Sequence, residues 1–202
     1  GGPLVSLFSL GNLYISDFIP KKAKPSHKVP LELCLAPKSG LVQLAHTAPF
    51  DEMYKTYWYK SGTNESMVEE LKQIATSVTR LMRVGKNDLW VDIGCNDGTL
   101  LSYLPKEAIR IGFDPVKNNY KELSELHANI IINDYFYAKA FKKSRYGKKR
   151  AKVITSIAMF YDLEDPHEFV GYVCDILDGD GLWVIQMSYL PLMLQQLAFD
   201  NI

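Results

Sequence analysis

Apolar positions follow two different spacings along the second half of the chain. Short runs rich in apolar residues, which are typical of buried strands, occur at residues 89–93, 109–113, 128–132, 152–157 and 182–187. The segments between these runs have helical spacing and cover residues 99–104, 116–126, 136–146 and 166–177. Strands that alternate with helices indicate βαβ units and a parallel sheet. We therefore predict an α/β fold, with a mostly parallel sheet that carries helices on both faces.

A longer amphipathic helix precedes the first of these strands. Its apolar positions recur at spacings of three or four and are Met67, Leu71, Ile74, Val78, Leu81 and Met82. Asn64 or Ser66 is placed to cap its N-terminus, and Glu69 stands where a capping box with Ser66 requires it. The helix is expected to end near Gly85.

The first 50 residues have a different character, because they are rich in proline and glycine and lack sustained helical spacing. Residues 31–35 and 41–44 alternate weakly, which predicts two short strands joined by a turn. We therefore divide the chain into an N-terminal extension of short strands and loops, residues 1–63, and an α/β domain, residues 64–202.

The composition is that of a folded globular protein without net charge. Of 202 residues, 47% are apolar, and 23 Lys and Arg balance 23 Asp and Glu. A protein that binds phosphate backbones nonspecifically is usually basic, so nucleic acid is disfavoured as a partner. Three cysteines without a CxxC pair are typical of a reducing compartment. With no signal peptide or membrane-spanning pattern, we expect a soluble, cytoplasmic protein.

One basic run stands out between the third and fourth predicted strands. It consists of Lys142, Lys143, Arg145, Lys148, Lys149 and Arg150. Such a run is usually a solvated helix end, where cations are favoured by the helix dipole. The alternatives are contact with nucleic acid and steering of an anionic small molecule towards a site.

The strongest chemical signal is a glycine-containing turn after the first predicted strand, V-D-I-G-C-N-D-G-T-L at residues 91–100. Gly94 and Gly98 allow a tight turn and close approach of a ligand, and free N–H groups at the following helix favour an anion. Asp92 ends the strand with a carboxylate suited to an ammonium group. The alternative is a purely structural turn.

Two further strand ends carry polar side chains. Asp114 follows the second strand about 20 residues after the glycine turn, where a carboxylate binds ribose hydroxyls. Asn133-Asp134-Tyr135 follows the third strand, where a carboxylate or amide meets an adenine amine. Parallel strands place these ends along one edge, so the three segments together predict a nucleotide site.

The glycine spacing fits a dinucleotide poorly, because G-x-G-x-x-G requires a glycine where Asn96 stands. It resembles motif I of the class I S-adenosylmethionine-dependent methyltransferases, D-x-G-x-x-x-G. By this resemblance the cofactor is S-adenosylmethionine and the fold is Rossmann-like. The residues expected at the cofactor are Asp92, Gly94, Cys95, Asn96, Asp97, Gly98, Thr99, Leu100, Asp114, Pro115, Asn133, Asp134, Tyr135, Ile157 and Ala158.

A closer resemblance is to the sugar C-methyltransferases of deoxysugar biosynthesis. The pieces that carry it are D-I-G-C-N-D-G-T-L-L at 92–101, S-G-L-V-Q-L at 39–44, Y-W-Y-K-S-G-T at 57–63, D-P-H-E-F at 165–169 and F-D-N-I at 199–202. The resemblance implies C-methylation of a nucleotide-linked keto-deoxysugar. It also implies that Tyr59 and Tyr57 act at the sugar, although aromatic clusters are more often packing surface.

Three departures from this family pattern change what we expect. The family's N-terminal zinc site uses CxxC pairs, but residues 36–40 hold no cysteine and Cys34 is displaced, so we expect no zinc. The family's His-Glu-His segment, thought to supply the base, follows the position of Ile202, so we expect a fragment that binds cofactor with little chemistry of its own. Tyr161 and Gln186 replace a histidine and an acidic residue.

Two other functions stay open beside the first. One is methyl transfer to another acceptor, such as RNA or a small metabolite. Residues 157–160, Ile-Ala-Met-Phe, lack the signature of amino-group methyltransferases and disfavour base amino groups. The other is a non-catalytic cofactor-binding module.

Overall fold

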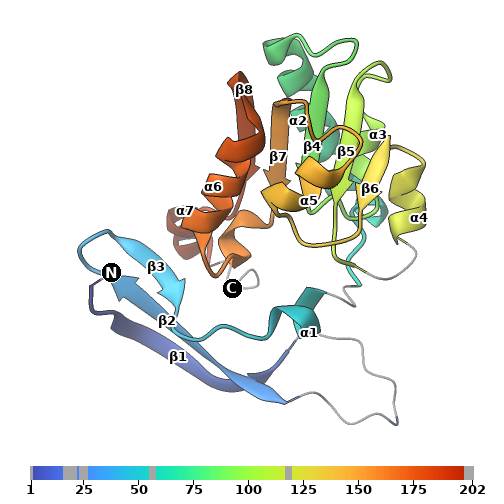
Figure 1. Ribbon diagram of the computed structural model, residues 1–202. Coiled ribbons are helices and arrows are strands. Elements are labelled where there is room, and N and C mark those ends of the chain that lie inside the picture. Colours follow the sequence, from blue (N-terminus) through green and yellow to red (C-terminus); the bar gives the residue numbers. More distant parts are fainter. Residues whose placement is uncertain (1, 16–21, 23–26, 55–57, 117–119, 198–202) are drawn as a thin grey trace. The chain divides into compact units, whose positions relative to one another are not determined.

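The computed structural model of the protein describes residues 2–15, 22, 27–54, 58–116 and 120–197 (Figure 1). The chain forms two compact units, residues 1–59 and 60–202. The sequence placed this division after residue 63. The four-residue difference has a physical reason, because Ser61 and Gly62 are hydrogen-bonded to the second unit.

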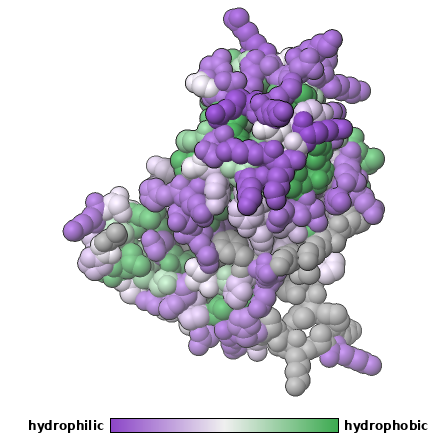
Figure 2. All heavy atoms as spheres, viewed as in Figure 1, coloured by the Kyte–Doolittle hydropathy of each residue, from purple (hydrophilic) through white to green (hydrophobic). Residues whose placement is uncertain are grey.

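The first unit contains an antiparallel sheet in the order β1-β2-β3 among its described residues. These strands are β1 (Val5–Tyr14), β2 (Lys28–Ala36) and β3 (Leu41–Leu44), followed by helix α1 (Phe50–Tyr54). The two short strands expected around residues 31–44 are therefore confirmed, and β1 was not predicted. Leu10 and Leu41 are among the exposed apolar residues of this sheet, and Figure 2 shows hydrophobic surface over its strands.

The second unit is built on a parallel sheet in the order β6-β5-β4-β7-β8, as far as the described residues show. Its strands are β4 (Leu89–Ile93), β5 (Ile109–Phe113), β6 (Ile130–Ile132), β7 (Ala151–Ile157) and β8 (Leu177–Gln186). Its α-helices are α2 (Glu65–Met82), α3 (Thr99–Ser102), α4 (Tyr120–Glu125), α5 (Ala138–Lys143), α6 (Pro166–Ile176) and α7 (Leu190–Gln196). The predicted Rossmann-like α/β fold is confirmed.

Apolar side chains fill both faces of this sheet. On one face Ala75 of α2 belongs to a buried cluster with Trp90 and Val153. On the other face Phe169 of α6 belongs to a cluster with Ile154. Burial of one such large side chain stabilises the fold by about 1.5–3 kcal/mol. Packing on both faces therefore holds the strands, and with them the strand ends, in fixed register.

The helix ends differ in detail from their predictions. Asn64 caps α2, because its Oδ1 accepts hydrogen bonds from the N–H groups of Ser66 and Met67. Glu69 instead contacts Lys72, so the capping box is wrong. The helix ends at Met82, where the left-handed residue Arg83 terminates it before Gly85. Asp165 caps α6 as expected, through the N–H of Glu168.

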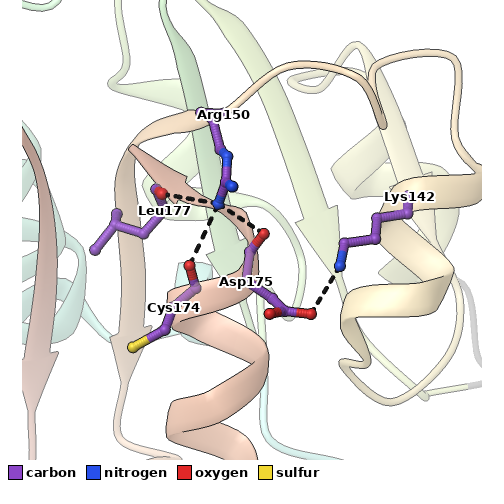
Figure 3. A network of polar contacts seen from close by, with 5 residues as sticks. All are labelled: Lys142, Arg150, Cys174, Asp175 and Leu177. Carbon is purple, nitrogen blue, oxygen red and sulfur yellow. Dashed lines mark hydrogen bonds and ion pairs between the residues drawn. The ribbon is translucent and has the colours of Figure 1, made fainter. Parts of the chain in front are cut away.

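Strand β8 begins five residues earlier than expected, directly after α6. Arg150 explains part of this connection, since its Nη1 donates to the carbonyls of Cys174, Asp175 and Leu177 (Figure 3). Lys142 pairs with the Asp175 carboxylate at 2.7 Å. Two members of the basic run therefore bind the C-terminal end of α6, a contact that the sequence did not predict. The predicted position of the run at the end of its own helix holds for Lys142 and Lys143, which lie in the last turn of α5.

This basic run lies at the amino-terminal edge of the sheet, because Ala151 begins β7. A surface depression of about 230 Å³ there is lined by Lys142, Lys148, Lys149 and Arg150 together with Asp175. A second one, of about 450 Å³, borders the start of β6 and Arg145. Neither includes a residue of the glycine turn, so neither marks the predicted nucleotide site.

Candidate cofactor site

The turn between β4 and α3 holds its shape through backbone geometry. Gly94 and Gly98 have φ of +76° and +80°, and Asn96 has φ of 49°. The N–H groups of Gly94 and Cys95 both donate to the carbonyl of Phe113, at 2.8 and 3.0 Å. The turn therefore folds back over the end of β5, which brings β4 and β5 together at one edge.

The two glycines of this turn have different constraints. A Cβ on Gly98 would lie 2.7 Å from the backbone Cα of Ser124, so Gly98 allows α3 and α4 to pack closely. A Cβ on Gly94 would meet only the flexible side chain of Met159, at 3.4 Å. Both glycines have a left-handed backbone, which favours glycine at either position. At Gly98 the close packing against Ser124 adds a second requirement, whereas the missing side chain of Gly94 leaves its backbone accessible to a ligand.

Asp92 is buried at the carboxyl end of β4. Its Oδ1 accepts a hydrogen bond of 2.6 Å from the hydroxyl of Thr155 on β7. Burial raises the pKa of Asp92 to about 7, the Thr155 hydrogen bond opposes that rise, and the charge of Asp114 adds to it. The group is thus held at the boundary between its neutral and ionised forms at neutral pH.

Asp114 lies just beyond β5, with both carboxylate oxygens already in use. Oδ2 accepts the N–H of Asn96 at 2.8 Å, and Oδ1 accepts the N–H of Val116 at 2.9 Å. Burial raises the pKa of Asp114, and these two backbone hydrogen bonds oppose the rise. Each carboxylate oxygen has a second lone pair, so the group can still accept from a pair of hydroxyls.

The segment after β6 supports the same edge. The Asn133 amide nitrogen donates to the carbonyls of Asp114 and Val116, at 2.8 and 2.7 Å. Asp134 is exposed, and its Oδ1 accepts the N–H of Tyr135 at 2.8 Å. Asn133 thus fixes the loop of residues 114–116, which includes Pro115. The carboxylate of Asp134 is the exposed acidic group of the segment after β6.

Asn96 and Asp97 make a contact that sequence analysis did not predict. Asn96 Oδ1 accepts the N–H of Ser61 at 3.0 Å, and Asp97 Oδ2 accepts the N–H of Gly62 at 2.9 Å. Asp97 Oδ1 also accepts from the hydroxyl of Thr99 at 2.6 Å. The short 3-10 helix Ser61–Thr63 is therefore anchored on the glycine turn. The sequence showed these two segments only as separate motifs, S-G-T at residues 61–63 and N-D-G-T at residues 96–99. Nothing in the sequence indicated that they contact one another.

The remaining predicted residues fall into two groups. Cys95 and Leu100 are buried, with the Cys95 sulfur against Gly112 and Leu100 in the apolar cluster beneath α2. Ile157 and Ala158 lie at the end of β7, where Ala158 is left-handed and its N–H donates to the carbonyl of Gln186 at 2.8 Å. Only the second group lies at the carboxyl edge with exposed atoms.

The described structure does not test the roles of the two tyrosines expected at the acceptor. Tyr57 lies outside the described residues. Tyr59 is exposed and ends the first unit, so its proposed role stays a prediction. In the described ranges, no group of three or more His, Cys, Asp or Glu is arranged to hold a metal ion. No described helix is long and apolar enough to cross a membrane.

A family comparison identifies the class to which this site belongs. A model described as methyltransferase domain matches residues 67–201, which is more than half of the chain and includes every strand of the parallel sheet. The glycine turn and the acidic strand ends lie within the matched residues, in agreement with the predicted methyltransferase class. The chain belongs to this methyltransferase-domain family.

Individual proteins are more distant. The C-methyltransferase NovU of Streptomyces niveus is 23% identical over 174 residues, which are 86% of this chain. The chain spans 41% of the length of this curated relative. The plantazolicin methyltransferase BpumL in complex with SAH has a TM-score of 0.49 and 18% identity, over 65% of this chain and 50% of that one. A complex of the Haloferax volcanii Trm112 methyltransferase activator with a putative methyltransferase has a TM-score of 0.46 and 19% identity, over 61% and 55%.

Proposed function

We propose that S-adenosylmethionine binds along the carboxyl edge of β4, β5 and β6. The observation that carries this proposal is the convergence of Asp92, Gly94, Asp114 and Asp134 at adjacent strand ends. Asp114 would bind the ribose hydroxyls and Asp134 the adenine amine. The open face of Gly94 would admit the methionine part, with its ammonium group near Asp92. This edge lies beside the point where strand order reverses between β4 and β7, the usual ligand position in such sheets.

The hydrogen-bond acceptors of this edge suit the hydroxyl and ammonium groups of S-adenosylmethionine. A ribose offers two neighbouring hydroxyls and Asp114 offers two fixed carboxylate oxygens, held by Asn96 and Val116. Those hydrogen bonds fix the orientation of the carboxylate, which favours binding because little reorganisation would be needed. Asp92 supplies the negative charge that an ammonium group requires.

We further propose that the acceptor is a nucleotide-linked keto-deoxysugar, methylated at carbon. Its support is the family resemblance of residues 57–63 and 92–101 and the similarity to a C-methyltransferase. The cofactor supplies an electrophilic methyl group on a sulfonium. C-methylation also requires that a base take a proton from the carbon beside the carbonyl, after which that carbon bonds to the methyl carbon and the sulfur leaves with its electron pair.

In this proposal Tyr59 and Tyr57 would lie at the sugar and polarise or deprotonate it. The edge of the sheet supplies positioning and charge complementarity, which bring the acceptor carbon in line with the methyl group. Ile157 ends β7 and Ala158 follows it, and both would contact the cofactor there.

Calorimetric titration with S-adenosylhomocysteine tests the cofactor part. We expect micromolar binding by the unaltered chain and at least tenfold weaker binding by Asp114→Ala. The matched control is Asp180→Ala, which removes an exposed aspartate of β8 and should bind normally. Absence of binding by the unaltered chain, or equal binding by both variants, would contradict the proposal.

The acceptor is tested separately with radiolabelled S-adenosylmethionine. A nucleotide-linked 4-keto-6-deoxysugar is expected to gain label at carbon, whereas an RNA pool is not. Label in RNA would favour the second acceptor class instead. Cofactor binding without transfer to either would favour a non-catalytic module.

A further inference from the structure

A chain of three buried polar groups runs beneath the proposed cofactor edge. Thr155 on β7 lies directly opposite Asp92 on β4 in the parallel register, and both are buried. The Thr155 hydroxyl donates to Asp92 Oδ1 at 2.6 Å. Trp90, two residues before Asp92, donates from its indole Nε1 to the Thr155 oxygen at 3.1 Å.

The direction of the Thr155 proton follows from these contacts. A hydroxyl has one proton, and its two possible acceptors here are Asp92 Oδ1 at 2.6 Å and the Val91 carbonyl at 3.4 Å. The shorter contact to a carboxylate is the stronger one. The Trp90 indole meanwhile occupies a lone pair of the same oxygen. The hydroxyl is therefore aimed at Asp92.

This contact leaves Asp92 with one bound oxygen and one available oxygen. Among the described residues Thr155 is the hydrogen-bond donor to the carboxylate, and it binds Oδ1 only. The neighbouring charge of Asp114, beyond β5, works against a negative charge on Asp92. The nearby Cys95 thiol adds no charge, because burial and the Asp92 carboxylate raise its pKa and keep it protonated. Thr155 thus supplies the hydrogen bond that favours the ionised form of Asp92, whereas burial and the charge of Asp114 favour the neutral form.

We propose that Thr155 is a positioning residue, which holds Oδ1 of the ionised Asp92 carboxylate so that Oδ2 faces the ammonium group of the bound cofactor. The proposal rests on the cofactor site described under Proposed function. It adds a residue from the strand across the topological switch point, since β7 starts the second half of the sheet. Thr155 does not itself contact the ligand.

The test compares Thr155→Val with the unaltered chain in S-adenosylhomocysteine titrations between pH 6 and pH 9. Valine has nearly the shape of threonine but offers no proton. Losing that proton raises the pKa of Asp92 further, so less of it is ionised near neutrality. We expect the variant's Kd to exceed the wild-type Kd about tenfold at pH 6, with the ratio closing towards one at pH 9. The ratio cancels any titration of the ligand, which is common to both proteins.

Thr155→Ser is the matched control, because it keeps the hydroxyl and should restore wild-type affinity across the whole pH range. A merely structural role for Thr155 predicts instead a ratio that does not change with pH, or a serine variant as weak as valine. Either result would overturn the proposal. If Thr155→Val does not fold, as judged by circular dichroism, Thr155→Ala replaces it in the same comparison.

Failure of the wider site is recognised by a different result. Without binding by the unaltered chain at any pH, the cofactor site itself is wrong, and the role of Thr155 falls with it. Binding by the unaltered chain that is insensitive to Asp92→Asn would leave the site in place but remove Asp92 from it, which also overturns the role of Thr155.

Discussion

The carboxylate of Asp97 accepts a hydrogen bond from the N–H of Gly62, 2.9 Å away and 35 positions earlier in the chain. This contact joins the glycine turn to the short 3-10 helix that precedes α2. A Cβ on Gly62 would lie 2.7 Å from Asp97 Oδ2 and 3.1 Å from Thr99 Oγ1. The absence of a side chain at position 62 is therefore what allows the two segments to meet.

Gly62→Ala should destabilise the protein by about 1–3 kcal/mol, because the new methyl group overlaps a carboxylate that holds the turn. It should also weaken S-adenosylhomocysteine binding, since Asp97 must move. Urea unfolding and calorimetric titration measure the two effects. Gly171→Ala is the matched control, since Gly171 is an exposed position of α6 with no atom near its missing Cβ. That variant should gain about 0.5–1 kcal/mol from helix propensity. Equal effects of the two substitutions would contradict the anchoring role.

The two glycines of the turn should separate stability from binding. Gly98→Ala places a Cβ 2.7 Å from the Ser124 backbone in a left-handed conformation, so we expect a loss of more than about 2 kcal/mol of stability. Gly94→Ala meets only the Met159 side chain, so its stability loss should be about 1–2 kcal/mol, from left-handed strain. Its S-adenosylhomocysteine affinity should nevertheless fall at least tenfold. Unfolding by urea and ligand titration on both variants decide the comparison, and normal affinity in Gly94→Ala would count against a ligand at this face.

The sequence predicted the parallel sheet and its strand ends because both depend on local patterns. Apolar runs define β4, β5 and β7, and the glycine turn follows the first of them. The helix that Asn64 caps was correctly located for the same reason. Strand β1 was missed because its apolar and polar residues do not alternate regularly. Its pairing with β2 shifts register between Ser6 and Phe8 and again between Ser9 and Gly11, which interrupts the two-residue period.

The long-range contacts of the site were beyond local patterns. Asn96 and Asp97 were expected at the cofactor, but their side chains also hold the backbone of Ser61 and Gly62, and spacing along the chain carries no trace of that pairing. Thr155 lies in a strand that was predicted correctly. Its contact with Asp92 depends on β7 lying beside β4, a strand order that the sequence does not state.

Asp92 should make the stability of the protein depend on pH. Its pKa is raised to about 7 by burial, above the ordinary value near 3.8 that it regains on unfolding. Between these pH values the folded state binds more protons than the unfolded state, so the contribution of Asp92 to stability falls as pH rises from about 4 to 7. Asp92→Asn removes this effect while keeping an oxygen for the Thr155 hydroxyl. Relative to wild type, the variant should become more stable by roughly 1–4 kcal/mol between pH 4.5 and pH 8. Urea unfolding at both pH values measures this, and a difference that is the same at both would rule it out.

Arg150 should act on stability alone. Its guanidinium donates to three carbonyls at the end of α6, on the amino-terminal edge of the sheet and away from the glycine turn. Arg150→Ala removes these charge-assisted hydrogen bonds and should cost about 1–2 kcal/mol of stability, with S-adenosylhomocysteine affinity unchanged. Lys148→Ala, which removes a neighbouring charge of the same run, should leave stability within about 0.5 kcal/mol of wild type. Thermal unfolding and ligand titration measure the two quantities. Unchanged stability of both variants would show that the end of α6 does not depend on Arg150. If both variants also lost cofactor affinity, the basic run would act on the cofactor site through its charge.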